Sequence, residues 1–255
     1  AGRWAGALAL LRRSEQLGVA LSLVAYSAAI LACAQARQWV AAVALLGRMS
    51  HSRVVPDILT FNIVINACGG VPWLQVLRLL HAMRIQAIHP STATYNAAIS
   101  SCQKGQMWEH AVGLFHLQQS SRTLPDVISY NSTISAYETS QQWELAISFL
   151  GKMRQSRCWP DAYSYSSLIS ACGKGHHVEL ALRLLREMDW YGVTQNIVTY
   201  NSSISACAAA QQWEQALALL AEAGRRRCAP GLEGFNAALA ACAPGGRWER
   251  ALGLL

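Results

Sequence analysis

Tryptophan recurs along this chain at a nearly constant interval of 35 residues. The positions that share this phase are Trp4, Trp39, Trp73, Trp108, Trp143, Trp213 and Trp248. Val178 occupies the phase inside the single doubled interval. Six cysteines follow the same period, with Tyr137 at their vacant position: Cys33, Cys68, Cys102, Cys172, Cys207 and Cys242. Two rare residue types on one period indicate an array of repeats rather than one globular core.

The period divides the 255 residues into six whole units and two partial ones. The whole units are 23–57, 58–91, 92–126, 127–161, 162–196 and 197–231. We expect residues 1–22 to supply the second helix of an earlier unit, and residues 232–255 to begin a later one. Because the chain starts and stops inside units, we expect it to be a fragment of a longer protein or an incomplete gene model.

Each unit has the pattern of two helices joined by a short polar break. In unit 127–161, Asp126 is a good N-cap for a first helix with apolar Ile128, Ile134 and Tyr137. The second helix carries one apolar stripe at helical spacing: Trp143, Ala146, Ile147, Leu150 and Met153. Pro160 cannot continue that helix. Such hairpins bury their apolar stripes only when stacked, so the sequence predicts an all-α fold, an α-solenoid of helix-turn-helix repeats.

Composition excludes several classes of chain and leaves one kind of partner open. With 53% apolar and only 14% charged residues, the chain is not disordered, acidic or collagen-like. Its formal net charge of +7 is compatible with an anionic partner such as nucleic acid. Residues 16–36 hold no charged side chain, but serine and glutamine interrupt them and they fall in register with two solenoid helices. We therefore expect no membrane association.

The residues that suggest metal, redox or nuclease chemistry are explained by the repeat. The periodic cysteines are expected in the core, and no Cys-x-x-Cys occurs, so neither zinc nor a disulfide is expected. His176, His177 and Glu179 lack the downstream Pro-Cys-x-x-Cys of a zinc deaminase and are expected on the surface. Acids that follow the tryptophan phase suit a helix N-terminus: Glu109, Glu144, Glu179, Glu214 and Glu249. We expect no cofactor, no small-molecule substrate and no catalytic site.

Several strings closely match one family of helical repeats. The first-helix strings are ILTFNIVINAC (58–68), TATYNAAISSC (92–102), VISYNSTISAY (127–137) and IVTYNSSISAC (197–207). Second-helix strings include WELA (143–146) and WEQAL (213–217), and Pro-Asp closes several units. The chain resembles the pentatricopeptide repeat family, in a P-type array, which implies a right-handed superhelix. Tetratricopeptide repeats have a 34-residue period and a Trp-Leu-Gly…Tyr signature that is missing here.

The resemblance implies that each repeat binds one base of single-stranded RNA through two or three side chains. In this family the fifth and last residues of a unit read the base, and the second residue packs against it. The reading pairs would be Ser27 with Asp57, Asn62 with Ser91, Asn96 with Asp126, Asn131 with Asp161, Ser166 with Asn196, and Asn201 with Gly231. These imply guanine, a pyrimidine, uracil, uracil, adenine and an unassigned base, which gives 5′-G-Y-U-U-A-N-3′. Asn236 would read a further base with a partner beyond the chain.

The packing residues implied by the resemblance are Val24, Leu59, Ala93, Ile128, Tyr163 and Val198. Ala93 is small and is expected to pack weakly. Glu233 holds this position in the last, partial unit, where an acid beside a base and phosphates is expected to be unfavourable. The periodic tryptophans are expected to pack between hairpins rather than on bases.

Some of these residues have a purely structural alternative, and the function has alternatives as well. Asp57, Asp126 and Asp161 could serve only as N-caps. The run Arg225-Arg226-Arg227 could attract phosphates or form a solvated helix end. The resemblance implies an RNA-binding adaptor for organellar transcripts in a plastid or mitochondrion, acting with RNA-processing proteins. The alternatives are a protein-binding scaffold, or the targeting part of a longer RNA-processing enzyme.

Overall fold

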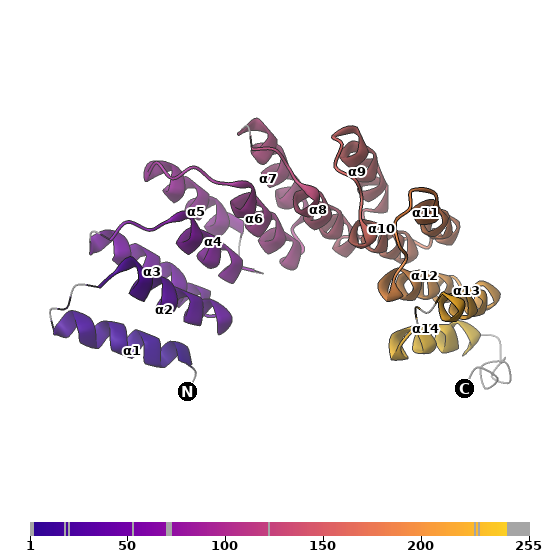
Figure 1. Ribbon diagram of the computed structural model, residues 1–255, viewed down its shortest axis with the longest axis horizontal. Coiled ribbons are helices and arrows are strands. Elements are labelled where there is room, and N and C mark those ends of the chain that lie inside the picture. Colours follow the sequence, from indigo (N-terminus) through magenta and orange to yellow (C-terminus); the bar gives the residue numbers. More distant parts are fainter. Residues whose placement is uncertain are drawn as a thin grey trace. The chain divides into compact units, whose positions relative to one another are not determined.

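The computed structural model describes residues 3–17, 19, 21–52, 54–69, 73–121, 123–226, 228 and 230–243. Within these ranges the chain forms fourteen α-helices and no β-strand (Figure 1). The predicted all-α fold of stacked helical hairpins is confirmed. The sequence predictions made for Arg227, Trp248 and Glu249 lie outside the described residues.

The chain divides into two compact parts, an N-terminal part (Ala1–Pro125) and a C-terminal part (Asp126–Leu255). The N-terminal part contains α1 (Arg3–Gln16), α2 (Leu23–Gln35), α3 (Trp39–His51), α4 (Ile58–Ala67), α5 (Trp73–Ile85), α6 (Thr92–Lys104) and α7 (Trp108–Ser120). The C-terminal part contains α8 (Val127–Thr139), α9 (Trp143–Gln155), α10 (Ala162–Lys174), α11 (Val178–Trp190), α12 (Ile197–Ala209), α13 (Trp213–Arg225) and α14 (Leu232–Cys242).

Each part is built from two layers of helices. The even-numbered helices pack side by side, as α2, α4 and α6 in the N-terminal part and as α8, α10, α12 and α14 in the C-terminal part (Figure 1). An odd-numbered helix packs against the even-numbered helix before it and the one after it, as α11 does between α10 and α12. The apolar face of each hairpin is therefore covered by its neighbours along the chain.

An aromatic residue in the first turn of the even-numbered helices anchors the core. The residues at this position are Tyr26, Phe61, Tyr95, Tyr130, Tyr165 and Tyr200, all almost fully buried. In α8 the large buried apolar side chains are Tyr130, Ile134 and Tyr137, whereas Ile128 is 59% exposed. Ile128 belongs to the apolar pattern of this helix but not to its buried face. It lies two residues from Tyr130, or about 200° around the helix, and so faces away from the core.

A left-handed residue closes the turn between the two helices of a hairpin. Gln141 has φ of +59°, and the next residue, Gln142, donates its N–H to the Tyr137 carbonyl at 2.9 Å. This is the helix-ending Schellman pattern, formed here without glycine. Equivalent positions with positive φ are Arg37, Gln106, His176 and Gln211. The short turn therefore sets where the following odd-numbered helix begins.

The periodic tryptophans contact the following repeat. The Trp73 ring stacks on His110 with ring centroids 4.1 Å apart, and Trp143 lies 3.9 Å from the ring of His177. Each contact joins one hairpin to the next within the same compact part. The predicted role of these tryptophans, packing between hairpins, is confirmed for Trp73 and Trp143.

The periodic cysteines belong to the core, as predicted. All six are buried, and none of the eight cysteines of the chain forms a disulfide. Burial raises the pKa of Cys68, Cys102, Cys172 and Cys207 to about 11. These thiols are therefore uncharged at neutral pH and chemically quiet. Among the described residues no group of three or more His, Cys, Asp or Glu side chains could hold a metal ion.

No helix among the described residues has both the length and the apolar character needed to span a bilayer. The uncharged stretch 16–36 is instead divided between the end of α1, a connecting segment and α2, which begins at Leu23. Its buried residues, such as Tyr26 and Cys33, face neighbouring helices.

Candidate nucleic-acid interface

The last residue of a unit caps the even-numbered helix that follows it. Asp57 Oδ1 accepts the Thr60 N–H at 2.8 Å, and Asp161 Oδ1 accepts the Ser164 N–H at 2.9 Å. Asp126 and Asn196 cap α8 and α12 in the same way, with N–H to oxygen distances of 2.9 and 3.0 Å. The predicted capping role of the aspartates is confirmed, and each cap holds a polar side chain at the start of an even-numbered helix.

Asn131 lies beside the capping aspartate of the next helix. Its Nδ2 donates to Asp161 Oδ1 at 3.1 Å, although 30 residues separate the two in sequence. Ser164 Oγ lies 2.5 Å from Asn131 Oδ1 and 3.0 Å from Asp161 Oδ1, so its single hydroxyl proton sits between the two side chains. Ser164 is completely buried, and Asn131 is only 8% exposed. The fifth and last residues of unit 127–161 therefore form one hydrogen-bonded group.

Ser27 and Asp57 are joined in a similar way through a third side chain. Thr60 Oγ1 lies 3.0 Å from Ser27 Oγ and donates to Asp57 Oδ1 at 2.6 Å. The hydrogen bond from the Thr60 side chain, followed by the one from its backbone N–H, lowers the pKa of Asp57 below its usual value. Asp57 is therefore ionised at neutral pH. Its carboxylate lies at the surface, where it can accept a hydrogen bond from a neutral or cationic donor.

Capping occupies only one oxygen of these carboxylates. Every described hydrogen bond of the Asp57 and Asp161 carboxylates ends on Oδ1, so Oδ2 of each has no partner among the described residues. A carboxylate has about four lone-pair sites, and the caps use only some of them. Helix capping and ligand binding by one aspartate are therefore compatible, so the structural role of these residues does not exclude the functional one.

Two other proposed reading pairs are not joined by a described hydrogen bond. Ser166 Oγ donates to the Tyr163 carbonyl of its own helix at 2.9 Å, rather than to Asn196. No hydrogen bond joins Asn62 to Ser91 among the described residues, and Asn62 Oδ1 is buried without a partner there. Asn96 belongs to the N-terminal part and Asp126 to the C-terminal part. Asn236 is exposed on α14.

The proposed packing residues all project from the even-numbered helices into solvent. Five are apolar side chains of moderate or large size and are between 52% and 76% exposed: Val24, Leu59, Ile128, Tyr163 and Val198. The sixth, Ala93, is exposed as well. These apolar side chains recur once per repeat, and each lies three residues before a polar side chain. Together they offer a series of surfaces on which flat rings can stack.

One groove in the C-terminal part shows how these positions share a surface. It has a volume of about 340 Å³ and lies against α10, α12 and α14. One face of α12 lines it with Val198, Asn201 and Ser205, at the i, i+3 and i+7 positions of a helix. Lys174 lines it from α10, and the same lysine donates to Glu138 Oε1 at 3.0 Å. A packing residue, a reading residue and a basic residue thus face one space.

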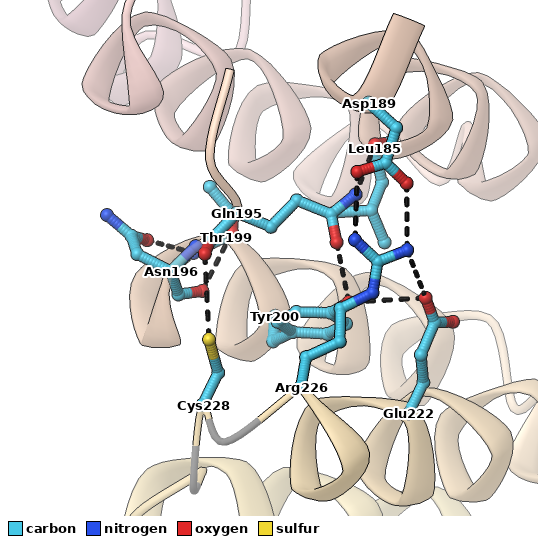
Figure 2. Close-up of polar contacts among 9 residues, drawn as sticks. All are labelled: Leu185, Asp189, Gln195, Asn196, Thr199, Tyr200, Glu222, Arg226 and Cys228. Atoms are coloured by element: carbon cyan, nitrogen blue, oxygen red, sulfur yellow. Dashed lines mark hydrogen bonds and ion pairs between the residues drawn. The ribbon is translucent and has the colours of Figure 1, made fainter. Parts of the chain in front are cut away.

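Arg226 is committed to an ion-pair network on the odd-numbered helices. Figure 2 shows its guanidinium between Asp189 and Glu222, with two 2.9 Å bonds to Asp189 and one of 3.2 Å to Glu222. The hydrogen bond to Asp189 raises the pKa of Arg226 further above its usual value. Bidentate pairing suits the planar guanidinium. Arg226 is therefore paired with two acids in the folded chain.

Models of one repeat family match most of the described chain. A model of the PPR repeat family matches residues 125–174, and a pentatricopeptide repeat domain model matches residues 9–71 and 183–245. A third model, of the PPR repeat, matches residues 93–117 and 163–193. Curated proteins give no match to this chain.

Solved structures with the same repeats are similar in fold. The pentatricopeptide repeat protein PPR10 from maize matches all of this chain over 42% of its own length, with a TM-score of 0.76 and 24% identity. PPR10 in complex with an 18-nt psaJ RNA element matches 93% of this chain over 39% of its own, with a TM-score of 0.61 and 24% identity.

The PPR domain of Arabidopsis thaliana PRORP1 in complex with tRNA matches 66% of this chain over 89% of that domain, with a TM-score of 0.54 and 13% identity. At these identities the likeness establishes the fold. The chain spans less than half the length of PPR10.

Proposed function

Because the chain belongs to the pentatricopeptide repeat family, we propose that it binds single-stranded RNA selectively, with one base at each repeat. The repeats would have the boundaries 23–57, 58–91, 92–126, 127–161, 162–196 and 197–231, with partial repeats at 1–22 and 232–255. Solved structures of the same fold in complex with RNA support this proposal.

The contact between Asn131 and Asp161 is the observation that carries the proposal. The amide has a second N–H, and Asp161 Oδ2 is an acceptor without a partner among the described residues. A uracil presents a carbonyl oxygen next to its N3–H, so a donor and an acceptor side by side can match its edge. Ile128, 59% exposed, can pack against the face of the same base.

Carried along the repeats, the reading pairs give the proposed core 5′-G-Y-U-U-A-N-3′. The protein would act as an adaptor that masks an RNA segment or guides processing, stability, editing or translation factors to it. Its place of action would be a plastid or mitochondrion, as the family resemblance implies. The net charge of +7 would add attraction that does not depend on sequence.

A binding titration with labelled RNA tests the proposal. The RNA 5′-GCUUAU-3′ is compared, at two salt concentrations, with a scrambled RNA of the same composition. We expect tighter binding of the ordered sequence, and weaker binding of both RNAs at higher salt. Equal affinity for the two RNAs would remove selectivity. If neither RNA were retained and a protein partner co-purified, the scaffold alternative would replace the proposal.

The Asn131→Thr variant adds a test at a single repeat. In this family threonine at the fifth position goes with a purine, so we expect the preference at the fourth base to move from uracil toward a purine. The other five bases act as internal controls. An unchanged preference at the fourth base would count against base reading by Asn131.

A further inference from the structure

Unit 197–231 ends in a residue that cannot read a base. Gly231 has no side chain, and it caps α14 without a side-chain hydrogen bond. Asn201, the fifth residue of the unit, therefore has no acid at the position that Asp161 holds for Asn131. By the sequence pattern alone, this repeat is incomplete.

A different acid contacts Asn201. Asn201 Nδ2 donates to Glu233 Oε2 at 3.4 Å, and Glu233 belongs to the first turn of α14. In unit 127–161 the equivalent amide nitrogen donates to a carboxylate oxygen at 3.1 Å. The two repeats thus share one arrangement, an asparagine amide beside a carboxylate, although the acid enters from two residues further along the chain.

The backbone of α14 is suited to this close approach. A side chain on Gly234 would place its Cβ 2.6 Å from Asn201 Oδ1 and 2.5 Å from Pro230. In α10 the equivalent residue is Ser164, which contacts Asn131 through its hydroxyl. Glycine in place of serine removes that hydroxyl and lets the first turn of α14, with Glu233, lie directly against Asn201.

The pair faces the groove between α10, α12 and α14. Its volume of about 340 Å³ is many times the ~30 Å³ of one water. Val198, 52% exposed, lines the same groove and can pack against a ring, and Lys174, which is ion-paired with Glu138, lines its edge. An apolar surface, a hydrogen-bond donor and a hydrogen-bond acceptor thus face one space that is open to a ligand.

We propose that Asn201 and Glu233 form a sixth base-binding site, in which Glu233 replaces the missing acid of unit 197–231. The site selects uracil, as the Asn131–Asp161 pair is proposed to do. This inference rests on the proposed RNA-binding function. It also reverses the expectation that an acid at Glu233 only repels RNA, and the two ideas predict opposite results when the charge is removed.

The test varies only the sixth base, in the four RNAs 5′-GCUUAN-3′, and measures affinity for the wild type, Glu233→Gln and Glu214→Gln. Glu214 is the matched control, because it is an exposed acid in the first turn of α13 and does not line the groove. We expect the wild type and Glu214→Gln to favour uracil by about tenfold, the scale of one good hydrogen-bonded base contact. We expect Glu233→Gln to reduce that preference below about twofold.

A second variant moves the acid back to the end of the unit. Gly231 has φ of −59°, which aspartate can adopt, so Glu233→Ala combined with Gly231→Asp should restore the uracil preference. Tighter binding of all four RNAs by Glu233→Gln, with one common factor, would overturn the proposal in favour of simple repulsion. An unchanged preference in Glu233→Gln would overturn it as well.

The fourth base separates this inference from the proposed function. If the wild type discriminates at the fourth base but not at the sixth, RNA reading stands and the role of Glu233 fails. If the wild type discriminates at neither base, the proposed function itself fails.

Discussion

Asn131 donates a hydrogen bond to Asp161 at 3.1 Å across 30 residues of sequence. The same carboxylate oxygen, Oδ1, caps α10 by accepting the Ser164 N–H. One aspartate therefore fixes the start of a helix and the orientation of an amide on the preceding helix. The geometry of a reading pair is thus set by the packing of one repeat on the next.

Replacing Asp161 with serine separates capping from base reading. Serine is about as good an N-cap as aspartate, so we expect the free energy of unfolding to change by less than about 0.5 kcal/mol. The carboxylate is lost, so the preference at the fourth base should change. Circular dichroism melting and RNA titration check the two effects. A large loss of stability with an unchanged base preference would show that Asp161 serves only as a cap.

The hydroxyl of Ser164 should hold the reading pair in place. Ser164→Ala removes the group between Asn131 Oδ1 and Asp161 Oδ1, so we expect weaker discrimination at the fourth base. A loss of about 1 kcal/mol in stability should accompany it, because a buried hydrogen bond is lost. The conservative variant Ser164→Thr should restore both properties.

Thr199→Ala is the matched control for Ser164→Ala. Thr199 is equally buried and belongs to the same kind of capping box, but its hydroxyl donates to the Asn196 carbonyl (Figure 2). No described hydrogen bond joins it to Ser166. We expect a similar loss of stability and unchanged discrimination at the fifth base. Equal loss of discrimination in both alanine variants would indicate a general effect of helix destabilisation.

Asp57 should make stability depend on pH in the acidic range. Its pKa is lowered in the folded state by the Thr60 hydrogen bonds, so its stabilising effect is complete above its unfolded value near 3.9. The effect is lost as pH falls through the lower, folded pKa. The Asp57→Asn variant keeps a capping side-chain oxygen but lacks the negative charge. We expect the wild type to exceed this variant by about 0.5 kcal/mol at pH 7 and to match it near pH 2. Thermal midpoints across this range measure the difference, and a constant gap would contradict the assignment.

The thiols should differ sharply in reactivity. Burial raises the pKa of Cys68, Cys102, Cys172 and Cys207 to about 11, so very little thiolate exists at pH 8. Cys158 and Cys228 are only partly buried. We expect a soluble alkylating reagent to modify these two first, and all eight only after denaturation. Mass spectrometry of the intact protein counts the modified thiols. Rapid labelling of Cys102 in the folded protein would contradict its place in the core.

The local features of the fold could be predicted from the sequence because they depend on neighbouring residues. Pro-Asp before an apolar run predicted the caps at Asp57, Asp126 and Asp161. The tryptophan period predicted where the odd-numbered helices begin, as at Trp143. The N-cap adjoins the helix that it caps and the helical period is local, so a short stretch of consecutive sequence contains the information for one hairpin.

The core of the hairpin was predicted less completely. Ile128 has the right type and an approximately helical spacing, yet it faces solvent, whereas Tyr130 is buried. An apolar residue in the first turn can serve the core or a binding surface, and only the packed neighbour decides between them. The recurrence of an aromatic residue at this position, from Tyr26 to Tyr200, was the signal that could have identified it.

The sequence by itself determined that this protein is an array of helical hairpins with buried cysteines and polar caps. Only the tertiary structure decided which polar side chains meet: Asn131 contacts Asp161, Ser166 turns back to its own helix, and Asn201 contacts Glu233 in place of the missing acid. The physical reason is that a hydrogen bond between repeats requires two side chains within about 3.5 Å. That distance depends on how closely one helix packs on the next, as Gly234 shows, and no single repeat encodes it.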